Sequence, residues 1–215
     1  MPTQLDVYNA ALDLLGEPAL TTIDQVGPEV PLLDRQWDFA LPELLRQFPW
    51  NWAKKRDDLE SASPAPSYGW EARYPLPDDF VTLLAINEET RLTPGSDYEI
   101  EGVYLMTDSD AANIEYIAKP TDGSGSLIDE DWTTEAMLNR MDPLALNALV
   151  TLLAAKIATR ISKDGLATSD ALLNRYYNND LVKARVRNQR EAKKPYVWPS
   201  RTSNWLTARH TSTNG

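Results

Sequence analysis

DPLALNALVTLLAAKIATRIS, residues 142–162, is the stretch that decides how this chain must fold. Asp142 is a good N-cap, and Pro143 suits the first helical position because its missing N–H is not needed there. Gly165 is the expected stop of this helix. Its apolar residues are Leu146, Val150, Leu153, Ile157 and Ile161 on one side and Leu144, Leu149 and Leu152 on another. A helix with two apolar sides must be covered from two directions, so we expect it in the middle of a helical bundle.

Three further helices are predicted around this central one. The first follows a Thr3 cap and ends at Gly16, and the second runs from about Glu29 to Phe48. Pro42 lies inside the second helix, where it removes a backbone hydrogen bond, so a kink is expected. The last helix is predicted to start at Thr168 or Ser169. The apolar stripes are Leu5, Tyr8, Leu12 and Leu15; Val30, Leu33, Trp37, Leu41, Leu44 and Phe48; and Leu173, Tyr177, Leu181 and Ala184.

From residue 50 the helical period gives way to strand-like segments. We expect a polar edge strand, a loop that runs into a buried strand, a hairpin that turns near Glu101-Gly102, and a half-buried strand. The segments are WNWAKKRDDL (50–59), YPLPDDFVTLLAI (74–86), YEIEGVYLMT (98–107) and NIEYIAK (113–119). The predicted fold class is therefore α+β. Residues 1–49 and 128–194 would form a helical bundle, and residues 50–127 an inserted antiparallel sheet of four or five strands.

The composition changes again after Pro195. Residues 195–215 are rich in Ser, Thr and Asn and show no periodicity, so they cannot form a packed element alone. We expect an extended C-terminal arm. Because buried aromatic side chains dominate interface energetics, Trp198 and Trp205 are its predicted anchors on a partner.

Charge is divided unevenly along the chain, whose net charge is −11. Residues 1–142 hold 9 Lys and Arg against 28 Asp and Glu, and residues 143–215 hold 12 against 4. Such a division suits a chain whose two ends meet different partners or whose copies pack head to tail. The alternative is that solvated faces happen to segregate. The basic candidates for a partner interface are Lys183, Arg185, Arg187, Arg190, Lys193 and Lys194.

The residues that carry most enzyme chemistry are scarce. The chain has no cysteine and its lone histidine, His210, lies near the end, so thiolate and His-based metal sites are excluded. The Asp108 segment has Asn113 where a calcium loop needs glycine. Gly123-x-Gly125 is followed by Ile128 where a dinucleotide loop needs a third glycine. Carboxylate pairs will arise by chance among 32 acids. No catalytic, cofactor-binding or metal-ligating residue is assigned, and the chain is not expected to be an enzyme.

Several stretches together are similar to one protein family. They are ALDLLGEPALTTID (11–24), FPWNWAKKRDDL (48–59), YPLPDDFVTLLAI (74–86), YEIEGVYLMTD (98–108) and IEYIAKP (114–120). Their order and spacing resemble the tail tubular protein A family, the head-to-tail adaptors of short-tailed bacteriophages. The resemblance spans roughly residues 4–190, with LGEP, W-N-W-A-K-x-R and Y-x-L-P-x-D-F as its motifs.

The resemblance implies a structural protein of the virion neck, assembled in the host cytoplasm. Twelve copies would form a ring between the portal protein and the tail nozzle protein. DNA would pass through the ring without specific binding, because an acidic channel wall repels phosphate. No cofactor and no membrane is implied. Some members of this and related families have been credited with degrading glycans, so an adaptor with an added cell-wall or capsule glycan hydrolase activity is the alternative. A DNA-packaging or DNA-binding module is the third possibility.

Overall fold

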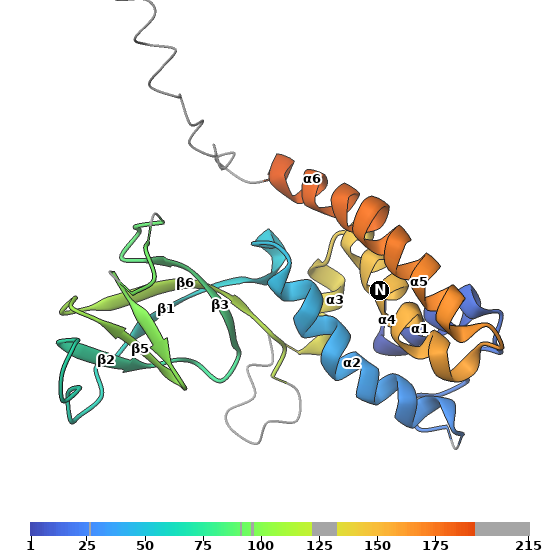
Figure 1. Ribbon diagram of the computed structural model, residues 1–215, viewed down its shortest axis with the longest axis horizontal. Coiled ribbons are helices and arrows are strands. Elements are labelled where there is room, and N and C mark those ends of the chain that lie inside the picture. Colours follow the sequence, from blue (N-terminus) through green and yellow to red (C-terminus); the bar gives the residue numbers. More distant parts are fainter. Residues whose placement is uncertain (26, 91, 96, 122–132, 192–215) are drawn as a thin grey trace, which may run out of the picture.

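The computed structural model describes residues 1–25, 27–90, 92–95, 97–121 and 133–191. The fold is α+β, as predicted, with the helices gathered at one end of the molecule and the strands at the other (Figure 1). The helices are α1 (Gln4–Leu15), α2 (Glu29–Arg46), α3 (Thr134–Arg140), α4 (Pro143–Ile161), α5 (Gly165–Arg175) and α6 (Leu181–Glu191). The strands are β1 (Lys54–Leu59), β2 (Ala72–Pro75), β3 (Phe80–Ile86), β4 (Glu99–Glu101), β5 (Tyr104–Thr107) and β6 (Ala112–Ala118).

Helix α4 is the core of the bundle, and the central position predicted for it is confirmed. The Asp142 carboxylate caps it by accepting the N–H of Leu144 at 2.8 Å, and Pro143 occupies the first turn. Helices α1, α2, α5 and α6 all pack on α4. By length and composition alone α4 could cross a membrane. Most of its side chains are nevertheless buried by the other helices, as the core helix of a bundle requires.

The prediction that Gly165 ends the central helix is wrong. Helix α4 ends at Ile161, and Gly165 is the first residue of α5 rather than a left-handed stop. A Cβ at this position would lie 2.7 Å from the carbonyl oxygen of Ala158, so only glycine lets the two helices come this close. The Ser169 hydroxyl then donates to the carbonyl of Ala155 at 2.8 Å. The last helix therefore begins earlier than Thr168 because it starts against the backbone of α4.

A π-helical segment, Tyr176–Asp180, joins α5 to α6 and changes which tyrosine is buried. The predicted stripe assumed a regular α-helical period and placed Tyr177 inside. The wider turn rotates the chain, so Tyr176 is fully buried while Tyr177 is 46% exposed. Buried Asp180 accepts hydrogen bonds from the Thr151 hydroxyl at 2.9 Å and from Arg175 Nε at 3.0 Å. These contacts fix the segment against α4.

The strands form two antiparallel three-stranded sheets where one sheet was expected. The orders are β1-β6-β3 and β2-β5-β4, and we call residues 54–118 the β region. β1 is an edge strand, as predicted, but it begins only after a 3-10 turn at Asn51–Ala53. Strand β2 lies partly in a segment that was predicted to be a loop. Its last residue is Pro75, which an edge strand tolerates at its end. The hairpin between β4 and β5 turns at Gly102 with φ +61°, as expected.

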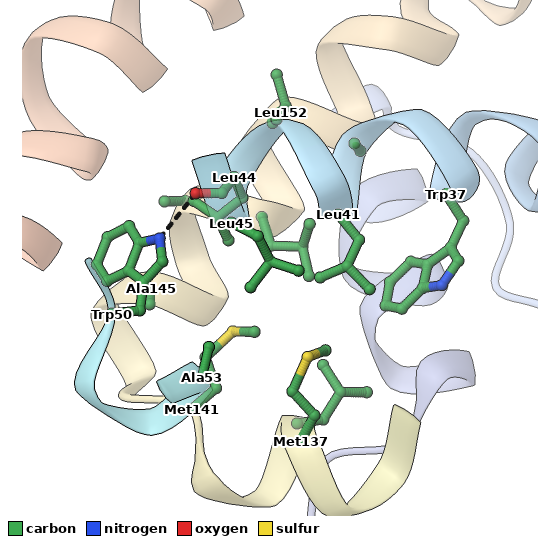
Figure 2. Close-up of a cluster of buried hydrophobic side chains, with 14 of the residues drawn as sticks. Trp37, Leu41, Leu44, Leu45, Trp50, Ala53, Met137, Met141, Ala145 and Leu152 are labelled. Atoms are coloured by element: carbon green, nitrogen blue, oxygen red, sulfur yellow. Dashed lines mark hydrogen bonds between the residues drawn. The ribbon is translucent and has the colours of Figure 1, made fainter. Parts of the chain in front are cut away.

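A buried cluster packs α2 against α3, α4 and the turn that precedes β1 (Figure 2). Trp50 is fully buried, and its Nε1 donates to the carbonyl of Leu44 at the end of α2 at 2.7 Å. Met137 of α3 and Met141 pack in the same cluster (Figure 2). Helix α3, a short helix capped by Thr133, was not predicted from the sequence. Helix α2 continues through Pro42, and the kink expected there stays a prediction.

Candidate partner interface

One side of α6 is anchored to the bundle and the other side faces outward. Leu181, Ala184 and Asn188 are buried. Asn188 fixes the helix to the chain after α2, because its Oδ1 accepts the N–H of Asn51 at 2.9 Å and its Nδ2 donates to the carbonyl of Pro49 at 3.3 Å. The side chains of Val182, Lys183, Val186, Arg187, Gln189 and Arg190 are therefore left exposed.

The exposed side of α6 combines apolar and basic residues. Val182 and Val186, one turn apart, are 46% and 44% exposed. Lys183 and Arg190 lie beside them, and neither has an ion pair within the described part of the chain. We call these four residues the α6 face. Exposed apolar side chains next to charges are typical of protein interfaces.

The other predicted basic candidates are placed differently. Arg185 turns inward, and its Nη2 donates to the carbonyl and Oε1 of Gln47 at 2.9 and 3.0 Å. Arg187 pairs with Glu191 at 3.0 Å and lies 3.7 Å from Asp142. The spacing of Arg187 and Glu191 by four residues is visible in the sequence, but Gln47 and Asp142 lie far away along the chain and no local pattern indicates them. The remaining candidates lie outside the described residues: Lys193, Lys194, and the predicted arm of residues 195–215 with Trp198 and Trp205.

The hairpin between β4 and β5 carries an acidic and apolar surface that the sequence analysis did not single out. Ile100 is 41% and Val103 65% exposed. Glu99 and Glu101 are exposed too, on the opposite face of β4 from Ile100, because successive side chains of a strand alternate. Glu99 accepts a hydrogen bond from Trp70 Nε1 at 3.2 Å, whereas Glu101 has no ion pair among the residues described. We call these four hairpin residues the hairpin tip. The signal in the sequence was two apolar residues flanking a glycine turn.

A hollow of about 940 Å³ over the β1-β6-β3 sheet brings acidic side chains together. The acids that line it are Asp57, Asp58, Glu88 and Glu115. Burial raises the pKa of Glu115, but hydrogen bonds from Arg56 at 2.7 Å and from Lys54 outweigh it and lower the pKa overall. A glycosidase needs one carboxyl that stays protonated at working pH and one that is ionised, so Glu115 could serve only as the ionised one. No cluster of His, Cys, Asp or Glu within the described ranges could hold a metal ion.

A scan against models of known protein families finds no match to this chain, and no curated protein matches its sequence. The resemblance to the tail tubular protein A family therefore rests on the quoted motifs. In the structure, W-N-W-A-K-x-R covers the turn after Trp50 and the start of β1, and Y-x-L-P-x-D-F leads from β2 into β3. LGEP begins at Leu15, the last residue of α1. The motifs thus lie at ends of elements and at the connections between them.

Proposed function

We propose that this chain is a structural head-to-tail adaptor of a short-tailed bacteriophage. Copies form a ring of twelve between the portal and the tail nozzle, around the channel through which DNA leaves. The observation that carries this proposal is that one chain presents two separate exposed surfaces. Each holds two exposed apolar side chains, and one surface is basic while the other is acidic. These are the α6 face and the hairpin tip. A subunit that must contact a neighbour on each side needs two such surfaces. The family-like order of the quoted stretches supports the same role.

The charge of the β region bears on the DNA. Residues 54–118 hold 14 Asp and Glu against 5 Lys and Arg, so phosphate is repelled from this part of the subunit. We therefore expect no tight DNA binding, in keeping with a channel that DNA slides through. Fluorescence anisotropy with duplex DNA at low and high salt measures this. Strong binding that salt abolishes would favour a DNA-binding module instead.

The decisive experiment is electron microscopy of the full chain, alone and mixed with portal rings from the same phage. Closed rings stacked on portals are the expected result. Raising the salt concentration should weaken assembly without unfolding the subunit, because exposed charge pairs are screened. Deleting residues 196–215, or replacing Trp198 with alanine, should weaken portal binding. A chain that stays monomeric in the presence of portals contradicts the proposal.

Among the described residues, the hollow over the β1-β6-β3 sheet is a feature that favours the alternative, an adaptor with added hydrolase activity. Its four carboxylates could in principle flank a sugar. The salt-bridged Glu115 cannot be the acid that protonates the leaving group, and we expect no turnover of cell-wall or capsule glycan. Release of reducing sugar by the purified chain, lost in both Asp58→Asn and Glu88→Gln, would establish the alternative.

A further inference from the structure

The α6 face and the hairpin tip match each other in chemistry. The hairpin tip offers two apolar side chains, Ile100 and Val103, and carries Glu99 and Glu101 on the other face of β4 from Ile100. The α6 face offers two apolar side chains, Val182 and Val186, beside basic ones. Each surface therefore offers apolar side chains that the other can bury, and charges of the sign that the other lacks.

The charges on both surfaces are available for a partner. Arg185 and Arg187 of the same helix are engaged within the chain, whereas Lys183 and Arg190 make no ion pair within the described ranges. Glu101 on the hairpin likewise makes none there. The hairpin that carries it is narrow, because β4 is a three-residue edge strand and Gly102 makes the turn. A narrow edge hairpin can reach a neighbouring molecule.

The two surfaces lie far apart on one chain. β5, which carries the hairpin, is at the strand end of the molecule, while α6 runs along the helical bundle (Figure 1). One molecule therefore cannot satisfy both surfaces by itself. In a pair of copies, the hairpin tip of one can contact the α6 face of the other. The second hairpin tip and the second α6 face stay free for further copies. Such a heterologous contact repeats from copy to copy and closes into a ring when the rotation allows it.

We infer that the hairpin tip of one copy, Glu99, Ile100, Glu101 and Val103, docks on the α6 face of the next copy, Val182, Lys183, Val186 and Arg190. This rests on the proposed function and names the contact that builds its ring. Charge complementarity selects a second copy as the occupant. A chain of net charge −11 repels its own copies at most orientations, and the basic α6 face is where an acidic hairpin is attracted. Nucleic acid would match the cations but not the valines.

The first test places a charge at each apolar centre. Val103→Asp damages only the hairpin tip and Val186→Asp only the α6 face, and both positions are exposed, so folding should persist in a thermal melt. Each variant alone should associate at least about tenfold more weakly in sedimentation, since buried apolar anchors carry interface energy. Leu166→Asp on α5, at a 76% exposed position, is the matched control and should assemble normally.

Mixing the two variants gives the sharpest result. A Val103→Asp chain keeps an intact α6 face and a Val186→Asp chain keeps an intact hairpin tip, so together they can form one good contact. The mixture should therefore yield pairs and stop there. A symmetric contact between two α6 helices would instead leave Val103→Asp assembling like the native chain, and that outcome overturns the inference.

Charge exchange supplies an independent check. Glu101→Lys and Lys183→Glu should each weaken association, and the chain that carries both should recover part of it. If neither mixing nor exchange has an effect while native rings still form on portals, this contact is wrong and the adaptor proposal stands. If the native chain forms no rings with or without portals, both fail.

Discussion

Replacing Gly165 with alanine probes the close contact between α4 and α5. The added Cβ would lie 2.7 Å from the carbonyl oxygen of Ala158, 2.7 Å from Thr159 Cα and 3.1 Å from Thr159 C. All three are backbone atoms of α4, so no side chain can rotate away to make room. Helix α5 must instead shift away from the core helix, and contacts such as the hydrogen bond from Ser169 to Ala155 would lengthen.

The expected loss follows from two opposing effects. Overpacking of a tight contact costs about 1–3 kcal/mol. Alanine also restricts the unfolded chain, which returns roughly 0.4–1 kcal/mol. Gly165→Ala should therefore lower the free energy of unfolding by roughly 1–2 kcal/mol. For a chain of this length each kcal/mol lowers the melting temperature by about 2–4 °C. Urea unfolding followed by tryptophan fluorescence measures the free energy directly.

Two controls separate crowding from other causes. Leu166→Ala changes the next residue, which is 76% exposed, and should alter stability by less than about 0.5 kcal/mol. Gly16→Ala introduces left-handed backbone strain at φ +75°, but its Cβ meets no atom within 4 Å, so it should cost about 1–2 kcal/mol from strain alone. If Gly165→Ala is as stable as the native chain, the close approach of α5 to α4 is refuted.

Three other substitutions test separate contacts. Arg185→Ala should lose about 1–3 kcal/mol in urea unfolding, because it deletes the hydrogen bonds that hold α6 to Gln47, the residue after α2. Exposed Lys183→Ala should lose less than about 0.5 kcal/mol, and equal losses would contradict this assignment. The pKa of Glu115 is lowered, so its charged form stabilises the fold above the ordinary carboxyl pKa, and this stabilisation disappears as pH falls through the folded pKa. The stability gap between the native chain and Glu115→Gln should thus shrink on acidification, and a pH-independent gap would refute it. Trp50→Phe removes the indole donor to the carbonyl of Leu44, which still accepts the backbone N–H of Gln47 at 3.1 Å. Losing this hydrogen bond should cost about 0.5–1.5 kcal/mol and lower the midpoint of a thermal melt, so an unchanged midpoint would rule out that bond.

Local signals in the sequence were enough to predict the main elements. Asp142 and Pro143 mark the start of α4 through capping chemistry, and the glycine turn marks the hairpin, so both were found. The π-helical segment was not found, because Asp180 is held there by Thr151, a partner far away in sequence. Helix α3 is one of the shortest helices and its buried Met137 and Leu138 give too little periodicity to detect.

Of the candidate interface, only the basic last helix could be predicted from the sequence. The excess of basic residues pointed to the last helix, but composition could not show that Arg185 turns inward while Lys183 stays exposed. The hairpin tip was hidden for a different reason. Ile100 and Val103 look like ordinary strand residues, and their exposure depends on β4 being an edge strand, which only the sheet order reveals.

During synthesis, α1 and α2 leave the ribosome long before α4, the helix against which both pack. At about 5–20 residues per second, the roughly 100 residues between α2 and α4 take roughly 5–20 s to translate. For that time the apolar sides of both helices, including Leu12 and Leu33, lack their native cover. The nascent chain should therefore be most exposed to chaperones and to misassociation at its N-terminal end, and slower translation of the β region should prolong that window.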